Sequence, residues 1–183
     1  MKKVLCLLFV LAITACVNEQ YLSDPQAAFD SVECEADDFR GTLTCTMPEK
    51  TTCSKDGSDS VMSCSGSRSY AKLRVVDTGQ SALFAITGHV FNLGWTFPHS
   101  ATDISGRDLE FNKTDTKVGY CPAAAGVCQT FEYFAIYLDR NYIKSHLYNG
   151  ITIKIYGQRG NSLITLPPAY VQGFDMFLRS QGI

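Results

Sequence analysis

The stretch at residues 128–138 (CQTFEYFAIYL) is the longest strand-like run of the chain, and it decides the fold class. Aromatic and β-branched residues favour strands, and the aromatic content of this run predicts a central strand. Toward the N-terminus, residues 70–77 (YAKLRVVD) alternate apolar Ala71, Leu73 and Val75 with polar neighbours, as a half-buried strand does. We therefore expect a mainly β domain, a β-sandwich or barrel-like fold, with one or two short helices near the C-terminus.

Further strands are expected on either side of these two runs. Residues 90–97 (VFNLGWTF) place large apolar side chains on one face, and Pro98 ends the run. Residues 101–117 are polar and rich in turn residues, with Leu109 and Phe111 marking one short strand. The remaining predicted strands lie at residues 81–87, 151–155 and 162–166, the last two forming a hairpin.

Two helices are predicted in the C-terminal third. The first covers residues 140–149, with Asp139 as its N-cap and Gly150 at its C-terminal end, which are the residue types that favour these positions. The second covers residues 168–179 and begins with proline, which suits the first turn of a helix. Gly173 costs this helix about 1 kcal/mol relative to alanine, so packing must compensate.

The chain has 183 residues, of which 45% are hydrophobic and 11% aromatic. This length fits one domain, and this composition can build a hydrophobic core, which excludes an intrinsically disordered chain. Lys and Arg number 16 against 18 Asp and Glu, a net charge of −2. Because nucleic-acid binding relies on an excess of cations, this balance argues against a nucleic-acid partner.

The N-terminus has the three parts of a secretory signal. Lys2 and Lys3 precede an apolar run at residues 4–13, and small residues follow before Cys16. This order of basic, apolar and small residues is typical of a signal peptide, which we place at residues 1–15. A transmembrane helix needs about 20 apolar residues, so the run is too short to span a bilayer.

Residues 13–16 (ITAC) resemble the lipobox of bacterial lipoproteins, in which an aliphatic residue and two small residues precede the lipidated cysteine. The resemblance implies that Cys16 becomes the first mature residue and carries a diacylglycerol and an N-acyl chain, which would anchor it to a membrane. In that family, Val17 after the cysteine implies the outer membrane, with the domain facing the periplasm or the cell exterior. A plain signal peptide cut nearby is the alternative. Residues 16–31 would then be the lipidated N-terminus and a tether, and residues 32–183 the single domain.

Six of the eight cysteines remain if the leader is removed and Cys16 carries lipid. An even number of cysteines in an exported chain indicates a disulfide framework, because the periplasm is oxidising. Two equal spacings of 11 residues suggest repeated hairpins closed by cysteines. We expect sequential pairing, with crossed pairing of the first four as the alternative, among Cys34, Cys45, Cys53, Cys64, Cys121 and Cys128.

Several short motifs occur in order in the C-terminal third: a cysteine pair, a Gly-Ile strand start, a Leu-Pro pair and a Gly-Phe pair. They lie at Cys121, Cys128, Gly150, Ile151, Leu166, Pro167, Gly173 and Phe174. Together they resemble the closing pattern of the invasion-associated locus B family. That family consists of small bacterial periplasmic or envelope proteins. The resemblance implies a β-rich fold, no established catalytic residues and a link to host-cell interaction.

The sequence contains none of the common motifs for catalysis or metal binding. The patterns GxSxG, GxGxxG, CxxC and the P-loop are all absent, so no nucleophile elbow, phosphate loop or zinc ribbon is encoded. His89, His99 and His146 stand alone, and the aspartates near residues 37 and 56 fit solvated turns. We therefore expect no metal, no cofactor and no enzymatic activity.

Tyrosines crowd the C-terminal third, and tyrosine favours interfaces because one end of its side chain is apolar and the other polar. We treat them as a candidate interaction surface, with ordinary strand packing as the alternative. These residues are Tyr133, Tyr137, Tyr142, Tyr148, Tyr156 and Tyr170.

The expected function is that of a lipid-anchored envelope protein with a binding, assembly or accessory role in the cell envelope or host interaction. Its partners would be the outer-membrane lipid, through the acyl anchor, and an unidentified envelope or host protein. Residues 65–70 (SGSRSY) loosely resemble the Ser-Gly-x-x-Tyr loop of periplasmic lysozyme inhibitors. Inhibition of lysozyme-type hydrolases is therefore one alternative, and an envelope hydrolase with an unrecognised site is the other.

Overall fold

The computed structural model describes residues 17–53, 67–121 and 126–183, so the leader, Cys16 and Cys64 lie outside the described residues. The strands are β1 (Glu33–Asp37), β2 (Thr42–Thr46), β3 (Lys50–Cys53), β4 (Arg68–Asp77), β5 (Ala82–Leu93), β6 (Pro98–Asp103), β7 (Asp108–Val118), β8 (Gln129–Leu138), β9 (Ile151–Gly157) and β10 (Gly160–Leu166). The helical segments are the 3₁₀ helix η1 (Val17–Leu22) and the α-helices α2 (Pro25–Asp30), α3 (Arg140–Ser145) and α4 (Pro168–Ser180).

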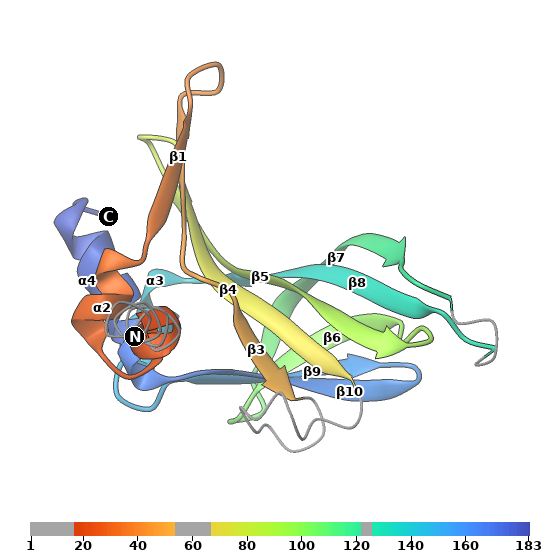
Figure 1. Ribbon diagram of the computed structural model, residues 1–183. Coiled ribbons are helices and arrows are strands. Elements are labelled where there is room, and N and C mark those ends of the chain that lie inside the picture. Colours follow the sequence, from red (N-terminus) through yellow and green to blue (C-terminus); the bar gives the residue numbers. More distant parts are fainter. Residues whose placement is uncertain (1–16, 54–66, 122–125) are drawn as a thin grey trace, which may run out of the picture.

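The ten strands of the described residues belong to one antiparallel sheet (Figure 1). Their order is β1-β2-β4-β5-β8-β7-β6-β9-β10, and β3 also pairs with β4. The sheet curls until β10 returns to β3, where the Thr165 N–H donates to Thr52 Oγ1 at 3.2 Å. The mainly β fold with short helices is confirmed, and β8 is the central strand predicted from residues 128–138, since it pairs with β5 and β7.

The inner face of the curled sheet forms the hydrophobic core, and α4 packs against it. Tyr170 on α4 is fully buried; its hydroxyl donates to the Pro48 carbonyl at 2.7 Å and accepts from the Leu73 N–H at 3.4 Å. Burying each large aliphatic side chain stabilises the fold by about 1.5–3 kcal/mol. The fully buried aliphatic residues of the strands include Leu73, Val75, Ile86, Ile136, Ile151, Ile153 and Ile164.

The segment predicted to be a tether, residues 16–31, is instead helical over most of its described part and packs on the domain. Asp24 Oδ1 accepts a backbone N–H from the first turn of α2, and Pro25 begins that helix, which is a strong N-terminal combination. Ala28 is fully buried against α4, and a Cβ at Gly173 would collide with the Ala28 side chain. This close contact between helices is the packing that compensates for Gly173.

Two strand predictions differ from the structure. The strand expected at residues 90–97 stops at Leu93, because the chain turns before Phe97, which has a φ of 54°, and Pro98 begins β6. Residues 101–117, expected to be rich in turns, contain most of β7. The short strand expected at Leu109 and Phe111 is the start of β7, but β7 continues to Val118 through residues that are all exposed, where the apolar alternation on which the prediction relied is absent.

The helix predicted at residues 140–149 forms, but it ends at Ser145 and is followed by turns up to Gly150. Asp139 caps it as predicted, since its Oδ1 accepts the Tyr142 N–H at 2.6 Å. The last helix is confirmed as α4, and the predicted hairpin is formed by β9 and β10. No helix among the described residues is long and apolar enough to cross a membrane.

Two disulfides within the described residues follow the sequential pairing. Cys34–Cys45 joins β1 to β2, and Cys121–Cys128 closes the connection that leads into β8. Cys53 at the end of β3 is also disulfide-bonded, and its expected partner lies outside the described residues.

Candidate functional site

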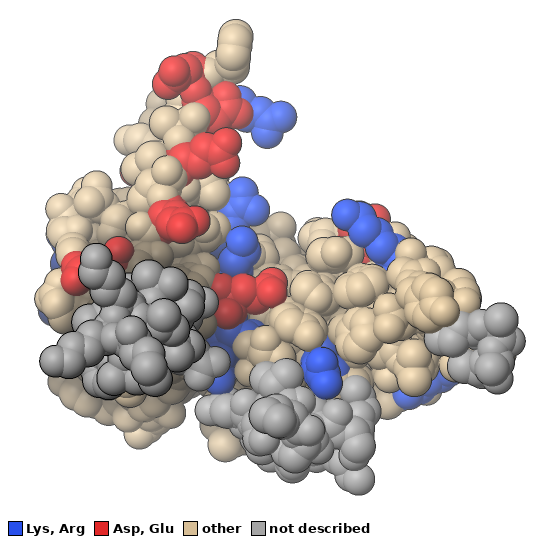
Figure 2. All heavy atoms as spheres, in the orientation of Figure 1, with Lys and Arg blue, Asp and Glu red and all other residues tan. Residues whose placement is uncertain are grey.

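The outer face of the sheet is hollowed beside the β1–β2 hairpin, where basic and acidic side chains meet (Figure 2). Alternate residues of a strand face the same side, so the register shows which side chains share this face. Lys72 on β4 lies opposite Thr87 on β5, which lies opposite Ala135 on β8. The next row across the sheet consists of Arg74, Ala85 and Tyr137.

We call this hollow, of about 530 Å³, the outer groove. Its floor carries small side chains, at Ala85, Thr87 and Ala135, so the long side chains around them form walls. The sheet is tightly packed here, because a Cβ at Gly88 would collide with the Tyr70 carbonyl oxygen of the neighbouring strand. The lining residues are Glu49, Lys72, Arg74, Val76, Leu83, Ala85, Thr87, Gly88, His89, Thr114, Tyr133, Phe134, Ala135 and Tyr137.

His89 and aromatic side chains close one end of the outer groove. The His89 ring stacks on Tyr70 with 4.5 Å between centroids and lies 5.2 Å from the Tyr133 ring. Burial lowers the pKa of His89, although the Glu49 carboxylate, 3.9 Å from Nδ1, opposes this effect. Burial therefore favours the neutral form of His89, and its ring forms a flat wall of the groove.

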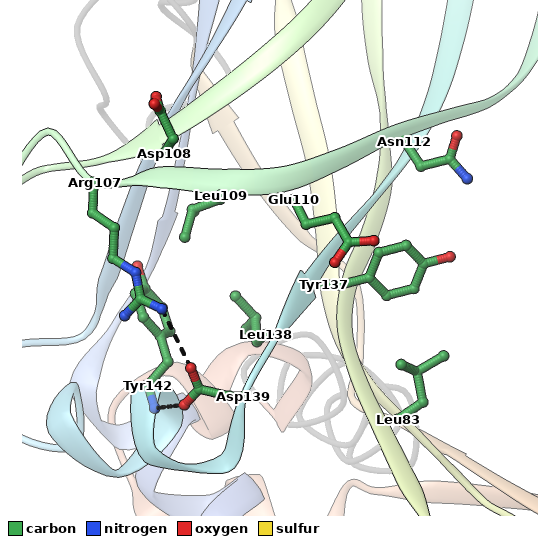
Figure 3. Close-up of a pocket in the computed structure, with 10 residues that line it drawn as sticks. All are labelled: Leu83, Arg107, Asp108, Leu109, Glu110, Asn112, Tyr137, Leu138, Asp139 and Tyr142. Carbon is green, nitrogen blue, oxygen red and sulfur yellow. Dashed lines mark hydrogen bonds and ion pairs between the residues drawn. The ribbon is translucent and has the colours of Figure 1, made fainter.

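A second hollow, of about 620 Å³, continues from the outer groove, since Leu83 and Tyr137 line both (Figure 3). We call it the polar hollow. Arg107 Nη2 lies 3.3 Å from Asp139 Oδ2, and the guanidinium stands over the Tyr142 ring at 5.4 Å. The Tyr142 backbone N–H, with help from Arg107, holds the pKa of Asp139 below its usual value. The other lining residues are Asp108, Leu109, Glu110, Asn112 and Leu138.

The six candidate tyrosines do not share one surface. Tyr133 and Tyr137 line the outer groove, because positions four apart on β8 face the same side. Tyr170 is fully buried, which removes it from any interaction surface, and Tyr142 is 3% exposed and lines the polar hollow instead. The remaining two, Tyr148 and Tyr156, lie elsewhere and line neither hollow.

The candidate histidines also lie apart, and the aspartates near residue 56 lie outside the described residues. Among the residues that the structure describes, no group of three His, Cys, Asp or Glu side chains could hold a metal ion. His99 is exposed on β6, and the ring of His146 lies 4.1 Å from that of Tyr142. Asp37 Oδ1 accepts the backbone N–H groups of the hairpin turn that follows it, as expected for a turn residue.

Comparison with protein families, curated proteins and solved structures gives no match for this chain. Its function is therefore inferred from its own residues.

No motif in the sequence marks Lys72, Arg74 or Thr87 as site residues. The alternation in residues 70–77 already placed the two cations on the polar face of a strand. The sequence does not show the strand register, which places small residues of β5 and β8 beside these two cations. Two cations next to small residues form a groove only once the three strands are paired.

Proposed function

We propose that this protein is an exported, lipid-anchored envelope protein that binds an envelope or host component in the outer groove. The observation that carries the binding role is the groove itself, with small residues between cations on β4 and tyrosines on β8. Binding sites are typically concave, with a few polar groups held on a rigid scaffold. Here the scaffold is three strands that are each paired on both sides.

The lipobox-like residues 13–16 and the disulfides support the exported location. Disulfides persist in oxidising compartments, and the resemblance to the invasion-associated locus B family agrees with an envelope location. Because η1 begins at Val17 and packs with α2 and α4, a lipid on Cys16 would hold the helical end of the domain close to the membrane. No long tether would separate the domain from the membrane.

Metabolic labelling with radiolabelled palmitate tests the anchor. We expect label in the wild type and none in Cys16→Ser. Cys6→Ser is the matched control, because Cys6 lies in the leader and its replacement should leave labelling intact. Equal labelling of Cys16→Ser and the wild type would overturn the anchor.

A photo-crosslinking phenylalanine analogue tests the groove in intact cells. Leu83 is 51% exposed and lines both hollows, whereas Tyr148 is 85% exposed and lines neither. We expect a defined crosslinked product at position 83 and not at position 148. The binding role is wrong if position 83 gives no product, or if both positions give the same one.

A further inference from the structure

The polar atoms of the outer groove indicate the ligand chemistry that it can accept. Lys72 and Arg74 are two residues apart on β4, and neither forms an ion pair with any described residue. Arg74 Nε and Thr87 Oγ1 are buried and have no hydrogen-bond partner among the described residues. Buried polar atoms rarely lack partners, but the protein itself covers these two atoms. The cationic ends of Lys72 and Arg74 are therefore the groups offered to a ligand, and a ligand with several oxygen atoms would complement them.

Glu35 and Asp37 on the β1–β2 hairpin share a separate hollow with Arg74, but no carboxylate among the described residues lies within ion-pair distance of Lys72 or Arg74. Glu49 is the one carboxylate among the described lining of the outer groove, and it faces His89. The carboxylates of Glu110 and Asp139 line the polar hollow, beyond Tyr137. An anion between the two cations would form charge-assisted hydrogen bonds, and arginine can pair with a carboxylate or sulfate through two parallel bonds.

The strand pairing argues against a peptide ligand. Peptides often bind by adding a strand to a free sheet edge, but β4, β5 and β8 are paired on both sides. Their backbone groups are therefore already hydrogen-bonded, and recognition in the groove depends on side chains. A ligand with its own rings and many polar substituents suits such a surface better than an extended chain.

Tyr133 and Tyr137 supply aromatic contacts along the same groove. They lie four residues apart on one face of β8, about 13 Å along the strand, so one elongated ligand can touch both. Sugar rings have apolar faces that pack on aromatic side chains and hydroxyls that pair with polar groups. Lys117, whose Nζ lies 5.2 Å above the Tyr133 ring, adds a further cation at this end.

We infer that the outer groove binds an anionic oligosaccharide, with its acidic groups at Lys72 and Arg74 and its rings against Tyr133 and Tyr137. This inference rests on the proposed binding role and names the ligand class for the same site.

Titration calorimetry on the full chain in detergent tests the inference with four probes of equal length. The probes are a heparin octasaccharide, an octagalacturonate, neutral maltooctaose and an octaglutamate peptide. We expect at least one of the two anionic sugars to bind, and the preferred one distinguishes a sulfated from a carboxylated source. Backbone amide signals of Ala85, Thr87 and Ala135 should shift on binding, since these residues form the floor.

Charge-neutralising variants locate the binding. Lys72→Gln combined with Arg74→Gln should weaken binding of the anionic sugar about tenfold or more, since charge-assisted hydrogen bonds are lost. Tyr137→Leu should weaken it as well. Lys144→Gln, on the exposed side of α3, removes the same charge away from the groove and should leave affinity unchanged. Thermal unfolding of each variant verifies that it is folded.

Three outcomes overturn the inference: maltooctaose binds as tightly as the anionic sugars, octaglutamate binds more tightly than they do, or Lys144→Gln weakens binding as much as the groove variants. Absence of sugar binding together with a persistent crosslink at Leu83 overturns the ligand class alone. Absence of both overturns the proposed binding role as well.

Discussion

Glu132 lies fully buried on the inner face of β8. Its carboxylate accepts the backbone N–H groups of Thr96 at 2.7 Å and Phe97 at 3.0 Å and contacts the Thr96 hydroxyl. Lys113 Nζ lies 3.8 Å away. Since Phe97 has a φ of 54°, a region that residues with a side chain seldom adopt, Glu132 holds the turn between β5 and β6 in place.

Glu132→Gln should lower the free energy of unfolding by about 1–3 kcal/mol, because the amide presents a donor to N–H groups that need acceptors. Urea unfolding measures the change. Glu110→Gln on exposed β7 is the control and should stay within about 0.5 kcal/mol of the wild type. Equal losses in the two variants would contradict the role given to Glu132.

The lowered pKa of His89 determines how the free energy of unfolding should respond to pH. Burial lowers its pKa in the folded protein below the ordinary value of 6.5, so the unfolded chain binds more protons once the pH falls below that value. We therefore expect the free energy of unfolding to decrease as the pH falls from about 7.5 to about 5.5. His89→Gln should flatten this dependence, whereas His99→Gln, at an exposed position, should not. An unchanged slope in His89→Gln would show that the histidine is not buried as described.

At the scale of elements, the contact between α2 and α4 shows why a glycine lies inside a helix. A Cβ at Gly173 would collide with the Ala28 side chain and with the backbone at Pro25 and Phe29. The short N-terminal helix can pack on α4 only because this position has no side chain.

Gly173→Ala should destabilise the protein by about 1–3 kcal/mol through this overpacking. The direction of the stability change distinguishes the two effects, because alanine would stabilise an isolated helix by about 1 kcal/mol relative to glycine. Met176→Ala, on the more exposed side of α4, is the control and should have a small effect in urea unfolding. A gain in stability from Gly173→Ala would contradict the docking of α2 on α4.

The strands and helices that the sequence predicted are those whose burial follows a regular period. In β4 and β9, buried and half-exposed residues alternate, and α4 buries Tyr170, Phe174 and Phe177, which helical spacing places on one face. In β7 only Leu109 and Phe111 are half-buried, and the residues that follow them are exposed, so the apolar period covers only the start of the strand. The short helix α2 was missed although Asp24 and Pro25 signalled its start, because six residues give too little periodicity.

At the scale of the whole molecule, the outer groove depends on long-range pairing and could not be predicted. The alternation in residues 70–77 places Lys72 and Arg74 on the polar side of a strand. That Ala85 and Ala135 lie beside them depends on β5 lying between β4 and β8, which is a property of the topology. The aromatic pair on β8 was identified among the tyrosines, but its role as a groove wall required the same topology.

Filling the groove tests its role most directly. Thr87 lies on the floor with its side chain toward the hollow, so Thr87→Trp should occupy the space available to a ligand. The measurement is the yield of the crosslinked product at position 83 in intact cells, with and without Thr87→Trp, in chains of equal thermal stability. The account predicts that the product is lost when the groove is filled; an undiminished yield would contradict binding in the outer groove.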